Sequence, residues 1–134
     1  MQDRPTVAEL LEAVRGFLEK DAIDALEGAA KFHARVAANV LAIVARELDL
    51  EPAQLAAEWR RLDELLGAAP APTDLPALRL GIRERTEALC ERIRRGEADT
   101  GPVRAAIVAH VRATVREKLS VTNPKLLAAE DAVR

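Results

Sequence analysis

Apolar residues recur every three or four positions along almost the whole chain, and this helical spacing constrains the fold more than any other feature. Residues 75–95 show it clearly, with a stripe made of Leu75, Leu78, Ile82, Leu89 and Ile93. The strict alternation of apolar and polar residues that marks a half-buried strand is missing over any useful length. We therefore predict an all-α protein, a single-domain antiparallel bundle of five to six helices covering residues 1–134.

Capping and helix-breaking residues predict where these helices begin and end. Thr6 and Glu9 have the spacing of a capping box, which starts a helix whose apolar stripe extends to Leu18. Whether residues 21–27 continue this helix or form a short second piece is left open. Glycine and proline predict loops near 67–74, 96–102 and 120–124. Further helices are expected at about 29–48, 52–66, 75–95 and 103–119, and from Pro124 onward.

The helix at 29–48 differs from the others because it has two apolar faces. One face carries large side chains: Phe32, Val36, Val40, Ile43 and Val44. The other carries only small ones: Ala34, Ala38, Ala42 and Ala45. A helix that is apolar on both sides is typical of a central helix, packed by neighbours all round. The alanine face would let another helix approach closely, from the same chain or from a second subunit, so we expect a homodimer.

Composition and charge limit the classes of protein. Hydrophobic residues make up 49% and charged residues 31%, with both signs interleaved and a net charge of -2, which excludes a disordered chain. A general nucleic-acid binder would show a basic excess, so no nucleic-acid partner is expected. The single cysteine, Cys90, permits no intrachain disulfide. The most apolar run, residues 36–45, is too short to span a bilayer and no signal-type stretch occurs near Met1, so we expect a cytoplasmic protein without a membrane partner.

The residues that usually carry chemistry are few. The chain has two histidines, and neither belongs to a Glu-x-x-His di-iron pattern or a His-Glu-x-x-His zinc helix. The six glycines are scattered singly, so there is no phosphate-binding loop. We therefore predict no catalytic residue, no metal ligand and no cofactor, and we expect a non-catalytic function.

The candidate polar site consists of His33, Arg35, Asn39 and His110. An asparagine on a mostly buried helix must be hydrogen-bonded, so we expect a partly buried Asn39 bonded outside its own helix. Two interpretations stay open. Arg35 supplies the charge of a pocket for a small anion or carboxylate, or it pairs with a carboxylate beside a structural asparagine. His110 could approach His33 if helices 29–48 and 103–119 pack together.

Arginines are frequent within 75–95, where Glu84, Glu87 or Glu91 lie at helix-neighbour spacing from most of them. Such spacing is typical of an ordinary solvated face with intrahelical ion pairs.

Three stretches together resemble a known family: FHARVAAN at 32–39, LCERIRRG at 89–96 and VREKLSVTNP at 115–124. They are similar to a family of small, uncharacterised bacterial all-helical domains. Those domains are often encoded beside, or fused to, aminoglycoside-phosphotransferase-like kinases, with acyl-CoA dehydrogenases nearby. The resemblance covers nearly the whole chain and implies association with a kinase or an acyl-CoA pathway. It brings no catalytic residue.

Two function hypotheses follow. The first is a non-catalytic interaction module that self-associates and serves as an accessory subunit of a phosphotransferase-like kinase in an acyl-CoA-linked pathway. The alternative is a binding domain for an acyl or phosphorylated metabolite, with a pocket between helices 29–48 and 103–119.

Overall fold

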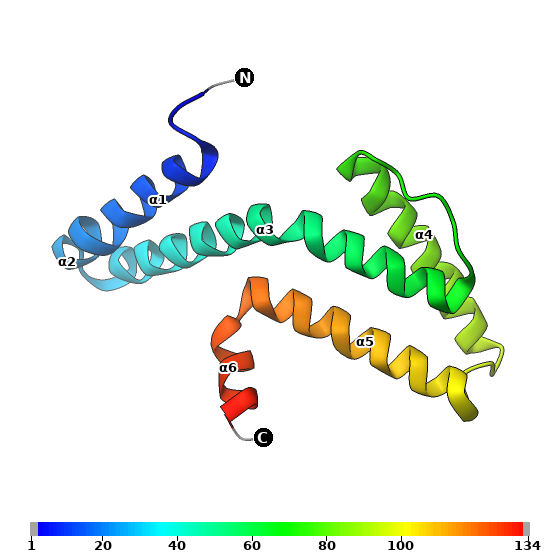
Figure 1. Cartoon of the computed structure of the whole chain (residues 1–134). Helices are drawn as coiled ribbons and strands as arrows, with labels where there is room; N and C mark the ends of the chain where they lie inside the picture. The colour runs from blue at the N-terminus through cyan, green and yellow to red at the C-terminus, as the bar shows by residue number, and fades with distance from the viewer. Residues whose placement is uncertain (1–2, 133–134) are drawn as a thin grey trace. The chain divides into compact units, whose positions relative to one another are not determined.

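The computed structural model describes residues 3–132, and every regular element in that range is helical (Figure 1). The all-α fold class is therefore confirmed. In chain order the elements are α1 (Val7–Phe17), the π-helix η1 (Leu18–Ala22), α2 (Ile23–Ala25), α3 (Gly28–Leu66), α4 (Leu75–Arg94), α5 (Gly101–Thr122) and α6 (Pro124–Ala132).

The chain folds as two compact units, Met1–Asp49 and Leu50–Arg134, called unit 1 and unit 2 below. Helix α3 supplies residues 28–49 to unit 1 and residues 50–66 to unit 2. Whether the chain behaves as one domain in solution stays a prediction.

The break predicted between helices 29–48 and 52–66 is wrong, because α3 runs through it with Pro52 inside the helix. Proline lacks a backbone N–H, so one helical hydrogen bond is lost there. The segment after it, Ala-Gln-Leu-Ala-Ala-Glu, consists of strong helix formers, and their propensity outweighs this loss. The boundary between the two units lies just before Pro52, so the sequence signal marks a change of unit and not the end of a helix.

Unit 1 begins with the predicted capping box. The Thr6 backbone N–H donates to Glu9 Oε2 at 2.6 Å, and the Glu9 backbone N–H donates to Thr6 Oγ1 at 3.2 Å. Helical structure then continues through η1 and α2, which settles the open boundary at Ala25. The chain reverses around Gly28, whose φ of 54° suits glycine, and α1 lies antiparallel beside the first part of α3 (Figure 1).

The two apolar faces of α3 in unit 1 differ in how much of their surface is buried. Ala34 and Ala38 on the small face are buried, at 7% and 4% exposure. Phe32 and Val44, on the large face, are 63% and 40% exposed. Packing on all sides is therefore not observed. Alanine lets a neighbouring helix approach closely, so the small face is the one covered inside this unit.

Unit 2 is built from the second part of α3 with α4, α5 and α6. Its core joins three of these helices through Trp59, Leu62, Leu78, Ile82, Leu89 and Ile107. Asp74 caps α4 by accepting a hydrogen bond from the Ala77 N–H at 2.9 Å, and Asn123 Oδ1 accepts one from the Leu126 N–H at 3.3 Å, which starts α6. The predicted loops are present at 67–74, 95–100 and 123, the last two shorter than expected.

Candidate functional site

The predicted polar residues are distributed over both units. His33, Arg35 and Asn39 lie on the part of α3 in unit 1, and all three are exposed. His110 lies on α5 in unit 2 and is buried. The structure does not test whether they form one site, so the predicted pocket between 29–48 and 103–119 stays a prediction.

The specific expectation for Asn39 is wrong. Its side chain is exposed, and it has no hydrogen bond to any residue within 3–132. The expectation assumed a helix covered on all sides, whereas the large apolar face of α3 next to Asn39 is open in unit 1. An exposed amide can bond to water and needs no protein partner.

The candidate site is a groove between α4 and α5, with a volume of about 500 Å³. Ile82 on α4 and Val111 and Val115 on α5 supply its apolar wall. Val111 and Val115 are 49% and 48% exposed, so this wall is open on one side. A cavity of this size with apolar walls and a few polar groups is typical of a ligand site.

The connection between the two helices determines which residues meet across the groove. Helices α4 and α5 are joined by the short segment 95–100 and run antiparallel (Figure 1). The start of the α4 lining, Arg79 and Arg83, therefore lies at the same end as Lys118, and Cys90 lies at the end with His110. Three cations of the lining thus gather at one end of the groove.

The three cations differ in their partners. Arg79 donates to the Glu51 carboxylate on α3, and this hydrogen bond lowers the pKa of Glu51 below its ordinary value. The side chains of Arg83 and Lys118 make no ion pair or hydrogen bond with any described residue. Two positive charges are thus open to an anionic ligand.

His110 lies in the wall of this groove and is only 6% exposed. Its Nδ1 is buried without a hydrogen-bond partner in the described part of the chain. Burial lowers the pKa of His110 below its ordinary value, and the charge of Arg61 lowers it further, against the opposing effect of Glu58 and Glu117. The imidazole is therefore neutral near pH 7.

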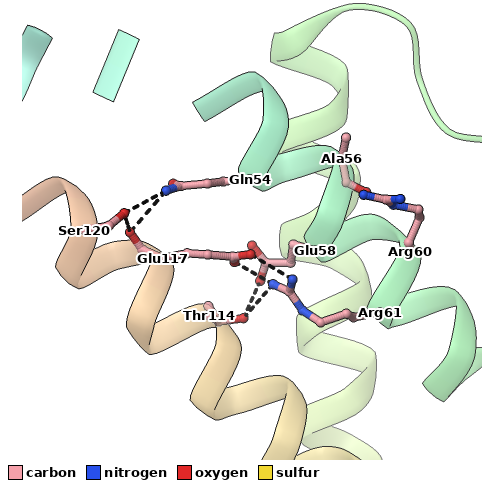
Figure 2. A network of polar contacts seen from close by, with 8 residues as sticks. All are labelled: Gln54, Ala56, Glu58, Arg60, Arg61, Thr114, Glu117 and Ser120. Carbon is pink, nitrogen blue, oxygen red and sulfur yellow. Dashed lines mark hydrogen bonds and ion pairs between the residues drawn. The ribbon is translucent and has the colours of Figure 1, made fainter. Parts of the chain in front are cut away.

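A polar network beside the groove ties α3 to α5 (Figure 2). The Arg61 guanidinium donates to both carboxylate oxygens of Glu117, at 2.8 and 2.6 Å, and to Thr114 Oγ1 at 3.4 Å. Two turns earlier on α3, Gln54 Nε2 donates to Ser120 Oγ at 3.0 Å and to the Glu117 carbonyl at 3.2 Å. These contacts fix α5 against α3 and so hold the wall that carries Val111 and Val115.

Sequence reasoning missed the role of the arginines on α4. Arg85 pairs with Asp63 at 2.9 Å and lies 4.8 Å above the Trp59 ring, and Arg92 donates to the Leu65 carbonyl at 2.6 Å. The solvated face predicted for these two residues is wrong, because Asp63, Trp59 and Leu65 belong to α3, 22 or more positions away in the sequence. No local spacing could have indicated such pairs.

Between residues 3 and 132, no three histidine, cysteine, aspartate or glutamate side chains lie where they could share a metal ion. Over the same range, no helix combines the length and the apolar character needed to cross a membrane.

Comparison with known families gives a match for most of the chain. The profile of the family described as "Domain of unknown function (DUF6285)" matches residues 24–126. The chain belongs to the DUF6285 family. This match covers α3, α4 and α5 completely, so the groove lies within the DUF6285 region, whereas α1 precedes it. It confirms the part of the resemblance that concerned an uncharacterised domain. No curated protein and no solved structure matches the chain.

Proposed function

We propose that this DUF6285 protein is a non-catalytic helical interaction module that self-associates as a homodimer through unit 1. Nine large apolar residues on α1 and the first part of α3 support this proposal, because each is 40–63% exposed. They form the apolar face of unit 1: Val7, Leu10, Val14, Phe17, Phe32, Val36, Val40, Val44 and Leu48. Val7 and Leu48 line one pocket, so the apolar stripes of the two helices meet at that end.

The size of this face fits a second copy of the chain. Nine half-exposed valine, leucine and phenylalanine side chains present on the order of 800 Å², which is the area that each partner contributes to a standard interface. Monomers rarely expose a contiguous apolar patch of that size. A two-fold dimer places the same patch of both subunits in contact, so each copy would cover the face of the other.

Arg15, the only cation of α1, pairs with carboxylates of α1 and of η1 directly after it. Arg15 pairs with Glu12 at 2.7 Å and with Glu19 at 3.0 Å, and these contacts raise the pKa of Arg15. The helix therefore needs no external charged partner, and its exposed apolar stripe is the feature through which another chain could bind it. This favours an apolar, self-complementary contact.

Sedimentation velocity on the full chain and two matched variants tests the dimer. Val44 in the apolar face of unit 1 and Val108 on α5 are both 40% exposed. We expect a dimer for the wild type and for Val108→Asp, and a monomer for Val44→Asp with unchanged helical circular dichroism. A monomeric wild type at tens of micromolar, or equal dissociation of both variants, would overturn the proposal.

We further propose that the chain is a cytoplasmic bacterial accessory subunit of a phosphotransferase-like kinase in an acyl-CoA-linked pathway. The support is the resemblance carried by residues 32–39, 89–96 and 115–124. Co-expression with a kinase encoded beside the gene tests it, and we expect the two proteins to co-purify. Separate elution, with no change in the solubility or activity of the kinase, would count against this role.

A further inference from the structure

The groove between α4 and α5 differs in shape and charge from the apolar face of unit 1. It lies wholly within unit 2, and about 500 Å³ is enough for a small organic molecule. Its apolar wall is formed by Ile82, Val111 and Val115, and its cations gather at one end. A ligand that fits this pattern is amphiphilic, with an apolar body and one anionic end.

The charges that line the groove define the anion. Arg79 is already paired with Glu51, so Arg83 and Lys118 are the lining cations that can meet an anion, with Glu58 and Glu87 as the lining carboxylates. These two carboxylates repel a monoanion less than a phosphate ester with nearly two negative charges. Arg83 is open to a ligand, and a guanidinium binds the two oxygens of a carboxylate well. A carboxylate is therefore favoured over a phosphate.

The length of the groove defines the apolar part. Arg83 and Cys90 both line it and are seven residues apart on α4, which corresponds to about 10 Å along the helix. An extended chain of about eight carbons covers that distance. The end near Cys90 also holds the buried His110, and the open cations Arg83 and Lys118 lie at the opposite end.

We propose that this groove binds a medium-chain fatty carboxylate. The carboxylate contacts Arg83 and Lys118, and the acyl chain lies along Ile82, Val111 and Val115 toward Cys90. This site is independent of the proposed dimer, since none of these residues belongs to unit 1.

Cys90 provides a direct measurement, because it is the only cysteine of the chain, is partly exposed and lines the groove. The experiment measures the rate at which the full-length protein reacts with a disulfide thiol reagent, as a function of octanoate or decanoate concentration. We expect saturable protection of at least tenfold. Each added methylene from hexanoate to decanoate should lower the apparent Kd about fourfold, because the groove buries its apolar surface.

Matched ligands and variants separate specific binding from adsorption. Decylammonium has the same chain with the opposite charge and should not protect Cys90. Arg83→Gln and Lys118→Gln should each weaken decanoate binding about tenfold. Arg112→Gln should not, because Arg112 is an exposed arginine of α5 outside this groove. Titration calorimetry with decanoate gives a second reading that needs no reaction at Cys90.

Several outcomes would overturn the proposal. These are the absence of decanoate binding by both methods, equal protection by decylammonium, and equal affinity of Arg83→Gln and wild type. Protection of Cys90 that rises with protein concentration but does not depend on decanoate concentration would show that a second copy of the chain fills the groove. Val44→Asp should bind decanoate normally, so failure of the dimer and failure of the ligand site are distinguishable.

Discussion

The Arg61 guanidinium of α3 and the Glu117 carboxylate of α5 form a two-pronged ion pair, with N–O distances of 2.8 and 2.6 Å. Both side chains are about four-fifths buried, and Arg61 Nε is buried without a partner. Each charge thus depends on the other for compensation. The backbone carbonyl of Glu117 also accepts a hydrogen bond from Gln54 Nε2. The ion pair and this hydrogen bond together set the position of α5 beside the groove (Figure 2).

We expect Glu117→Gln to lower the free energy of unfolding by about 1–3 kcal/mol, since it leaves Arg61 partly buried without an anion. Urea unfolding of the single variants and of Arg61→Met/Glu117→Leu forms the test. The double variant should lose less stability than the sum of Arg61→Met and Glu117→Leu. Strict additivity would show that the two side chains act independently.

Gly81 packs against Trp59, the only tryptophan of the chain. A Cβ at position 81 would lie 2.8 Å from Trp59 Cζ3 and 3.3 Å from Cη2. The indole cannot move freely, because it is 6% exposed and its Nε1–H donates to the Ala69 carbonyl at 3.2 Å. We therefore expect Gly81→Ala to destabilise unit 2 by about 1–3 kcal/mol, despite the better helix propensity of alanine.

Gly16→Ala is the matched control for this prediction. Gly16 also lies within a helix, but a Cβ there would meet nothing within 4 Å. This variant should gain up to about 1 kcal/mol from helix propensity alone. Thermal unfolding followed by circular dichroism gives both values, and Trp59 fluorescence reports the local disturbance. A stabilised Gly81→Ala would show that Trp59 can move aside.

Helices and their ends were predictable wherever local residues determine them. The stripe in 75–95 identified α4, and its members Leu78, Ile82 and Leu89 are buried as a helical stripe requires. The Thr6 capping box works in the same way, because both partners lie within one turn. At Pro52 the local rule failed, since the flanking helix formers carry α3 through the proline.

The groove could not be predicted because its residues lie on different helices. Arg83 and Lys118 share a groove end only through the length of segment 95–100, which sets the register of α5 against α4. No spacing within either helix encodes that register. The two faces of α3 pose a similar problem, because periodicity shows that Phe32 and Ala34 lie on different sides but not which side is covered.

Replacing Pro52 tests how much α3 loses at that position. Alanine there restores a backbone N–H that can donate to the Leu48 carbonyl, and it removes the steric conflict of the proline ring with that carbonyl. We expect Pro52→Ala to raise the free energy of unfolding by about 1–3 kcal/mol. Chemical denaturation measures the gain. Hydrogen exchange should show a protected amide at position 52, and a rapidly exchanging amide there would contradict a continuous helix.

Asn39 should be replaceable, because it is exposed and bonds to no described residue. Asparagine is a poorer helix former than alanine, so Asn39→Ala should change the free energy of unfolding by no more than about 0.5 kcal/mol, in the stabilising direction. Thermal unfolding is sufficient to measure this. A loss above 1 kcal/mol would show that Asn39 has a partner in the folded protein after all.

His110 makes stability depend on pH. Burial and the charge of Arg61 lower its pKa in the folded protein below the ordinary value of 6.5, so the unfolded chain binds the proton more tightly. The stabilisation is therefore complete above about pH 6.5 and is lost as the pH falls toward the lowered pKa. Urea unfolding at pH 7.5, 6.5 and 5.5 should show this decline in the wild type. The decline should persist in His33→Gln, since His33 is exposed, and flatten in His110→Gln. An equal decline in all three proteins would assign it to the carboxylates and exclude a role for His110.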